Sequence, residues 1–142
     1  MLWKKSGLPE SDAQYVASGT NPTGCLRLTQ AKWKVDGKFI DKTIYFRNTV
    51  FGHFVWKKIK SNPFVEMTEV LFNVNILGKD LGQYKLEIRH KPSGEAGQSN
   101  YTTSLSWGEL GEKIKDMDLR HKDFFLYAPI KGREEPFYID IK

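Results

Sequence analysis

The most regular feature of the sequence is an alternation of apolar and polar residues over short stretches. Two of these stretches, residues 70–77 and 84–89, flank Gly78-Lys79-Asp80-Leu81-Gly82, a loop with a glycine at each end that is typical of a β-hairpin. Further stretches with a period of two cover 26–28, 44–46, 105–107, 124–128 and 137–141. Because successive side chains of a strand point to opposite faces, each stretch can bury one face and expose the other. The pattern predicts at least seven strands, and hence a mainly β fold that closes or nearly closes into a barrel.

One segment has the spacing of a helix instead. Apolar residues recur at intervals of three and four between 107 and 117, which places them on one helical face. Glu109 and Glu112 come early in this segment, where the helix dipole favours negative charge. The pattern predicts a short helix from about 108 to 117 that leads into a strand at 123–128. By periodicity, the core includes Trp107, Leu110, Ile114, Phe124 and Phe137.

Two long segments have the composition of loops. Residues 6–24 and 91–100 are dense in Gly, Pro, Ser, Asn and Gln. Loops longer than roughly 12–15 residues are uncommon in compact domains and often carry function. Each segment is therefore either an inert, solvent-exposed loop or a functional one. Since no internal repeat or linker divides the chain, we expect residues 1–142 to form a single domain.

The composition excludes several classes of protein. Of the 142 residues, 39% are hydrophobic and 13% aromatic, which is too apolar for a disordered chain. We expect no membrane association, because the sequence has neither a run of about 20 apolar residues nor the pattern of a signal peptide. Cys25 is the single cysteine and cannot form an internal disulfide, which fits a reducing compartment such as the cytoplasm. Beside Leu26, Cys25 is predicted to be a buried, small apolar side chain.

The net charge of +5 is modest, but it is unevenly distributed. Residues 13–65 hold nine Lys and Arg against two Asp, a net charge of +7, which leaves −2 for the rest of the chain. No acidic residue occurs between 42 and 65. Such a stretch is either a solvated lysine-rich surface or a surface that attracts an anionic partner, and charge alone does not separate the two.

The sequence lacks the residue patterns of common catalytic and metal sites. It has no Gly-x-Ser-x-Gly motif, no His-Glu-x-x-His helix, no cysteine pair and no Walker-type glycine loop. His121, Lys122 and Asp123 are consecutive at a predicted strand entrance, so neighbouring side chains would point apart and not form the His-x-Lys pair of phospholipase D chemistry. We therefore expect no catalysis, no metal and no cofactor in this chain.

The two polar segments carry side chains suited to the edges of DNA bases. Arg and Lys pair with guanine, Asn and Gln with adenine, and Asp or Glu accepts a hydrogen bond from cytosine. The candidates for base reading are Asp12, Gln14, Asn21, Arg89, Lys91, Ser93, Glu95, Gln98, Asn100 and Tyr101. Phosphate contacts position a protein on DNA without specifying sequence. The candidates for phosphate binding are Lys4, Lys5, Arg47, Lys57, Lys58, Lys60 and His90.

The order of motifs in the second half of the chain resembles that of the plant B-three transcription-factor domain. The resemblance is carried by Tyr84-Lys85-Leu86-Glu87-Ile88-Arg89, the polar loop, Tyr101-Thr102-Thr103-Ser104-Leu105, and Leu119-Arg120-His121-Lys122-Asp123-Phe124 after the predicted helix. The chain is more similar still to the DNA-recognition domains of phospholipase-D-family restriction endonucleases. The residues that carry this similarity are Ser6-Gly7-Leu8 and Ser93-Gly94-Glu95-Ala96-Gly97-Gln98-Ser99-Asn100-Tyr101-Thr102-Thr103.

The resemblance implies a seven-stranded DNA-binding pseudobarrel, B-three-like, with one or two short helices. Two arms, an N-arm at about 6–24 and a C-arm at about 89–101, would clamp the major groove of double-stranded DNA and read a short site. The chain would then be the target-recognition domain of a restriction-modification endonuclease, not an enzyme by itself. In the full-length protein a nuclease domain is expected as a partner, and this sequence lacks the His-x-Lys pair of that domain.

Two other functions remain open at this point. A reader of modified cytosine would flip its base into an aromatic pocket, for which Trp33, Tyr45 and Trp56 are candidates, although each also suits core packing. A small-ligand or carbohydrate-binding β-barrel would use exposed aromatic residues and the polar loops. That second alternative leaves the basic stretch at 42–65 unexplained.

Overall fold

The fold is mainly β, as predicted, in a computed structural model that describes residues 1–15, 24–28, 33–41, 44–91 and 102–142. Its strands are β1 (Trp3–Lys5), β2 (Cys25–Arg27), β3 (Lys34–Val35), β4 (Lys38–Phe39), β5 (Lys57–Ile59), β6 (Asn62–Ile76), β7 (Lys79–Lys91), β8 (Thr102–Ser106), β9 (Phe124–Tyr127) and β10 (Phe137–Ile141). Its helices are a π-helix, η1 (Tyr45–Val50), a 3₁₀-helix, η3 (Gly108–Leu110), and a single α-helical turn, α1 (Gly111–Ile114).

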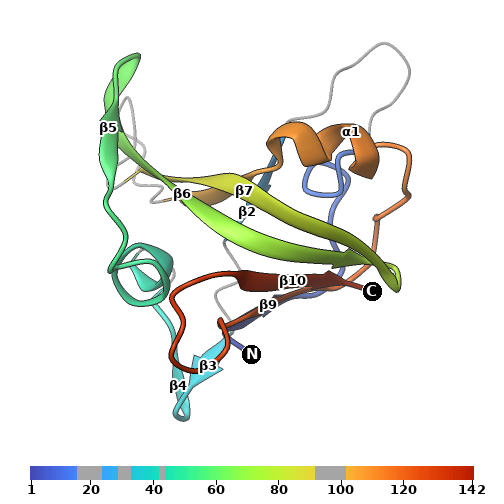
Figure 1. Ribbon diagram of the computed structural model, residues 1–142, viewed down its shortest axis with the longest axis horizontal. Helices are drawn as coiled ribbons and strands as arrows, with labels where there is room; N and C mark the ends of the chain where they lie inside the picture. The colour runs from blue at the N-terminus through green and yellow to red at the C-terminus, as the bar shows by residue number, and fades with distance from the viewer. Residues whose placement is uncertain (16–23, 29–32, 42–43, 92–101) are drawn as a thin grey trace.

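Eight strands form one curled sheet. Seven of them follow the order β1-β9-β10-β6-β7-β8-β2, and the eighth, β5, pairs with the first residues of β6. The pairs are antiparallel except β10 and β6, which run parallel. In Figure 1 the β6–β7 hairpin has the longest strands of the sheet. Helix α1 lies beside this hairpin, and the small β3–β4 hairpin lies below it in the view. The sheet therefore curls into a half-barrel with an inner, apolar face and an outer, mixed face.

The β6–β7 hairpin follows directly from the alternating pattern. Val70, Phe72, Val74 and Ile76 are buried, whereas the residues between them are half-buried or exposed. The chain turns at Leu77 and Gly78, whose φ angles of 51° and 81° match the type I′ turn that suits the strand twist. The predicted loop at 78–82 is thus shorter in the structure, because Lys79–Gly82 already belong to β7.

The inner face holds one aromatic core. Trp3, Phe46 and Phe124 pack edge to face with ring centroids 5.0–6.0 Å apart, which adds to the apolar burial. All five residues assigned to the core by periodicity are buried: Trp107, Leu110, Ile114, Phe124 and Phe137. Apolar periodicity, with a period of two in the strands and of three to four in the helical segment, therefore identified these inward-facing side chains.

Two local predictions need correction. The helix predicted at 108–117 is split into η3 and α1 and ends at Ile114, in a segment that its two glycines already weaken. The strand predicted at 44–46 is wrong, because Tyr45–Val50 form the π-helix η1. Three residues cannot distinguish a period of two from a helical period, and burial of Tyr45, Phe46 and Val50 favours the helix here.

Candidate nucleic-acid interface

The outer face of the sheet carries a row of basic and hydroxyl side chains. Register places Arg89 of β7 opposite Ser104 of β8, and Ser104 opposite Arg27 of β2. One row further, Lys91 lies opposite Thr102 on the same pair of strands. Because alternate residues of a strand share a face, Arg89 and Lys91 point outward while Ile88 and His90 are buried.

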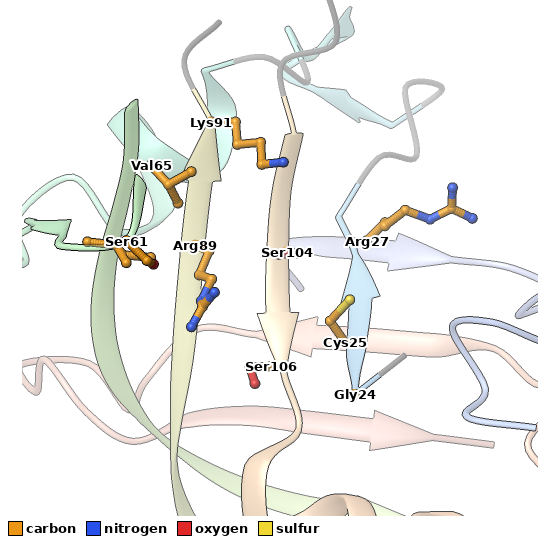
Figure 2. Close-up of a pocket in the computed structure, with 10 residues that line it drawn as sticks. Gly24, Cys25, Arg27, Ser61, Val65, Arg89, Lys91, Ser104 and Ser106 are labelled. Atoms are coloured by element: carbon orange, nitrogen blue, oxygen red, sulfur yellow. The ribbon is translucent and has the colours of Figure 1, made fainter. Parts of the chain in front are cut away.

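These residues line a cleft of about 550 Å³. Figure 2 shows its lining side chains on neighbouring strands, with the Lys91 ammonium group reaching from β7 towards β8 and Arg27 extending outward from β2. The lining residues are Gly24, Cys25, Arg27, Ile59, Ser61, Val65, Arg89, Lys91, Ser104 and Ser106. Ile59 of β5, Ser61 of the turn that follows and Val65 of β6 line the cleft, so the β5–β6 hairpin forms one of its walls.

All charged side chains that line the cleft are cationic. Arg27 and Arg89 are about half exposed, at 53% and 50%. Each has one acidic neighbour: Arg27 Nε lies 3.5 Å from the Asp12 carboxylate, and an Arg89 terminal nitrogen lies 3.2 Å from the carboxylate of the half-buried Glu87. The cleft therefore attracts anions and offers serine hydroxyls as additional donors.

The structure brings together part of the predicted base-reading set. Arg89 and Lys91 lie in the cleft as neighbours. Sequence reasoning missed Arg27, Ser104 and Ser106, although alternation over 102–106 places the two serines on the outer face with Arg89. Cys25 was predicted to be buried, but it is half-buried and lines the cleft, because β2 is the end strand and its outer face is uncovered by another strand.

Asp12 and Gln14 do not fit the predicted base-reading role, because both side chains are 2% exposed and occupied by internal partners. Asp12 accepts hydrogen bonds from Lys5 Nζ at 2.6 Å and from the Arg27 backbone nitrogen at 3.1 Å. The Gln14 side chain donates to the Cys25 carbonyl at 2.8 Å and accepts from Gly24 nitrogen at 2.7 Å. These contacts fix the entry into β2, so both residues support the structure instead of facing a ligand.

Asp12 and Lys5 also join the two ends of the curled sheet. Lys5 lies on β1 and donates a second hydrogen bond to the Arg27 carbonyl of β2 at 2.9 Å. β1 and β2 are the first and last strands of the sheet order, so this buried pair links the edges that the curl brings together. Lys5 was predicted to bind phosphate, and its burial within this link does not fit that role.

The described part of the predicted N-arm, residues 6–15, is packed against the loop before β9. Gly7 nitrogen donates to the Asp123 carboxylate at 2.9 Å, and Leu8 exchanges backbone hydrogen bonds with Lys122 and His121. The Arg120 guanidinium lies 3.8 Å from the centre of the Tyr15 ring. Two of the motifs that carry the family resemblance, Ser6-Gly7-Leu8 and Leu119–Phe124, therefore contact each other.

The side chains of two more predicted phosphate-binding residues, Arg47 and His90, bind other groups of the protein. Arg47 forms an ion pair with Glu66 at 2.8 Å and stacks on Trp56 at 4.6 Å, so its guanidinium is not presented to a ligand. His90 is 4% exposed and shares a 2.8 Å hydrogen bond with Thr103. Burial lowers the pKa of His90, Glu66 opposes this shift, and Arg47 adds to it. A buried, uncharged imidazole does not suit phosphate.

The other predicted phosphate-binding residues differ in position. Lys57, Lys58 and Lys60 are exposed on β5 and its turn, and they belong to none of the salt bridges found among the described residues. Lys4 lies near Asp123 and the Phe125 ring, away from the residues that line the cleft. Six predicted base-reading residues lie outside the described ranges: Asn21, Ser93, Glu95, Gln98, Asn100 and Tyr101.

A second cavity, of about 290 Å³, lies on the outer face of β6, β9 and β10. We call it the tyrosine face; its lining residues are Asn73, Asn75, Tyr127, Tyr138, Ile139 and Asp140. Tyr127 and Tyr138 are cross-strand partners, and Asn75 donates to Asp140 at 3.3 Å. This cavity offers aromatic and amide groups and one carboxylate.

Two of the three residues considered for a flipped base, Tyr45 and Trp56, donate hydrogen bonds within the fold, and Trp33 packs partly buried against the core. The Tyr45 hydroxyl donates to the Leu2 carbonyl at 2.6 Å, and burial raises its pKa. The Trp56 indole donates to the Phe51 carbonyl at 3.0 Å.

Within the described ranges, no three His, Cys, Asp or Glu side chains gather in a metal-binding arrangement. In the same ranges, no helix has the length and apolar character needed to cross a bilayer.

Comparison with family models, with curated proteins and with solved structures finds no match to this chain.

Proposed function

We propose that this chain binds double-stranded DNA through the basic cleft, as the target-recognition domain of a restriction endonuclease, and catalyses no reaction itself. The observation that carries the proposal is the row Arg27–Ser104–Arg89, together with Lys91, in a cleft whose charged lining residues are all cationic. A polyanion is the partner whose charge matches this lining, and phosphate contacts dominate the affinity of proteins for DNA.

The attachment of the polar segments supports sequence reading at the same cleft. Residue 24 directly precedes β2, Lys91 ends β7 and Thr102 begins β8. Segments 16–23 and 92–101 are thus joined in the chain to the strands that line the cleft. In this proposal Asn21, Ser93, Glu95, Gln98, Asn100 and Tyr101 read bases beside Arg89 and Lys91.

The lysines of the β5–β6 hairpin extend the basic surface. Lys57, Lys58 and Lys60 are exposed on the hairpin that forms one wall of the cleft. They would hold phosphates and position the duplex, whereas Arg27 and Arg89 have the planar, forked geometry that pairs with phosphate or with guanine.

The finer description of the fold belongs to the same proposal. The B-three-like pseudobarrel with two DNA-clamping arms is supported by the curled eight-stranded sheet and by the contact between Gly7 and Asp123. A nuclease domain in the full-length protein and a prokaryotic cytoplasmic location follow from the resemblance of the motifs.

Selection of bound duplexes from a random library tests the proposal. We expect an enriched short motif, and binding to random duplex that weakens with salt at a slope of roughly −0.9 per phosphate neutralised. The triple variant Lys57→Ala, Lys58→Ala, Lys60→Ala should weaken binding to enriched and random duplexes alike. It should also make the salt slope shallower, by about one for each phosphate that the variant no longer neutralises. Absence of any enriched motif would refute sequence recognition.

A second candidate function is binding of a neutral small ligand such as a sugar at the tyrosine face. The observation that favours it is the pairing of Tyr127 and Tyr138 beside Asn75 and Asp140, which combines aromatic surface with hydrogen-bonding groups. Its affinity would not depend on salt. Saccharide binding that Tyr138→Ala abolishes, in a protein that does not bind duplex DNA at low salt, would favour this candidate.

A further inference from the structure

Behind the basic cleft lies a row of polar side chains on the inner face of the same strands. Glu66 of β6 is paired with His90 of β7, and His90 with Thr103 of β8. Lys58 of β5 is the cross-strand neighbour of Glu66 on the other side. This row interrupts an inner face that is mostly apolar, at the end of the sheet where β7 stops and β8 begins.

The contacts of this row are specific. His90 Nδ1 and Thr103 Oγ1 lie 2.8 Å apart, and both residues are almost fully buried. The Trp56 ring packs edge-on to His90 with centroids 6.4 Å apart, and Arg47 holds Trp56 and Glu66 in place from η1. Removing one partner of a buried hydrogen bond leaves the other partner unsatisfied, which costs free energy. A shift of β7 along β8 would break this hydrogen bond, so the bond opposes such a shift.

The position of His90 in the chain connects this row to the cleft. His90 lies between Arg89 and Lys91, and Thr103 lies between Thr102 and Ser104. Because side chains alternate along a strand, fixing His90 and Thr103 inward fixes their neighbours outward and sets the register of Arg89 with Ser104.

We propose that the hydrogen bond between His90 and Thr103 is a pin that positions Arg89, Lys91 and Ser104 for DNA, so that His90 and Thr103 are positioning residues that do not touch the DNA. This inference rests on the proposed function. It implies that the affinity of the cleft for DNA depends partly on His90 and Thr103, which are buried behind it. Glu66 and Arg47 are the charged groups that act on His90, and Lys58 is the cross-strand neighbour of Glu66. An uncharged imidazole avoids placing a third cation beside Arg47 and Lys58.

The test uses two matched substitutions. Thr103→Val removes the hydroxyl of the pin and keeps the side-chain shape. Thr68→Val is the control, because Thr68 is also buried on the inner face and donates one hydrogen bond, to the Val55 carbonyl at 3.0 Å, but lies outside the cleft and outside the pin. Thr103→Ser keeps the hydroxyl and should rescue binding.

We expect both valine variants to lose similar stability in denaturant unfolding, whereas only Thr103→Val weakens binding to labelled random-sequence duplex DNA, by about tenfold, since coupled neighbours commonly interact by about that factor. Equal affinities of the two valine variants, while Arg89→Ala still weakens binding, would overturn the pin and leave the proposed function standing. No binding by the wild-type protein, or unchanged binding by Arg89→Ala, would instead overturn the proposed function and the pin with it.

Discussion

The basic cleft and the tyrosine face are two outward surfaces of one curled sheet, and they differ in charge. The cleft, over β2, β5, β6, β7 and β8, has three cationic lining residues, Arg27, Arg89 and Lys91, and no acidic one. The tyrosine face, over β6, β9 and β10, has one charged lining residue, Asp140. Both surfaces arise from the same alternation of side chains, so alternation alone does not decide which surface meets a partner. The sign of the charge distinguishes the two surfaces, because of the two the cleft is the one whose lining would attract a polyanion.

The lysines near the two surfaces also lie in different environments. Lys4 and Lys142 lie over the Phe125 ring, at 5.2 and 5.1 Å from its centre, and are near Asp123 and Asp140. Lys57, Lys58 and Lys60 belong to none of the salt bridges found among the described residues, although Glu66 is the cross-strand neighbour of Lys58. A basic residue near carboxylates contributes little to the attraction of an anion, whereas clustered bases add their fields.

Breaking the link between the two ends of the sheet should have the largest effect. Asp12→Asn leaves Lys5 buried between β1 and β2 without its carboxylate, and loss of one partner of a buried pair costs about 3–5 kcal/mol of unfolding free energy. Denaturant unfolding measures this loss. Asp140→Asn is the control, since its ion pair with the 61%-exposed Lys142 is worth at most about 1 kcal/mol. If the two variants were equally stable, the link would have no role in closing the sheet.

Reversing one charge in the cleft should have the next largest effect. Arg89→Glu places a carboxylate in the row with Ser104 and Arg27, and we expect a loss in duplex affinity of roughly ten- to hundredfold, about 1–3 kcal/mol. The matched control is Lys142→Glu, which makes the same change in net charge beside the tyrosine face. Fluorescence anisotropy with a labelled duplex compares the two. Equal losses would mean that only net charge matters and that the cleft has no special role.

The sequence predicted the architecture better than the site, for a physical reason. Apolar periodicity reports burial, so the core around Trp107 and Phe124 and the β6–β7 hairpin were predictable from local pattern. The presence of a polar residue in the sequence indicates much less about whether its side chain faces the protein interior or the solvent. Asp12, Gln14, Lys5 and His90 are polar and lie in promising segments, yet tertiary partners hold them inside.

The cleft residues that the sequence analysis missed also show that local sequence pattern does not specify tertiary contacts. Arg27 and Ser104 join the cleft through the pairing of β2 with β8, a contact across more than seventy residues of chain. No local pattern specifies such a pairing. Once the register is known, the outward direction of Arg27, Ser104 and Arg89 follows from alternation alone.

The smallest expected effect concerns pH. Because burial lowers the pKa of His90 below its ordinary value of 6.5, the unfolded chain takes up a proton at a pH where the folded chain does not. His90 therefore makes stability fall as pH decreases below about 6.5, by at most about 1.4 kcal/mol per pH unit. Unfolding of the wild type and of His90→Gln at about pH 7.5 and about pH 5.5 isolates this contribution, since the ordinary pKa of histidine lies between them. Identical pH dependence in the two proteins would exclude it.

The most direct test of DNA binding at the cleft is a nuclear magnetic resonance titration with duplex DNA, read at the backbone amides of both surfaces. We predict that amides of Arg27, Arg89 and Ser104 shift on binding, while those of Tyr127 and Tyr138 keep their free positions. Shifts centred on Tyr127 and Tyr138 with no change at Arg89 would contradict the central claim that the basic cleft is where this protein meets DNA.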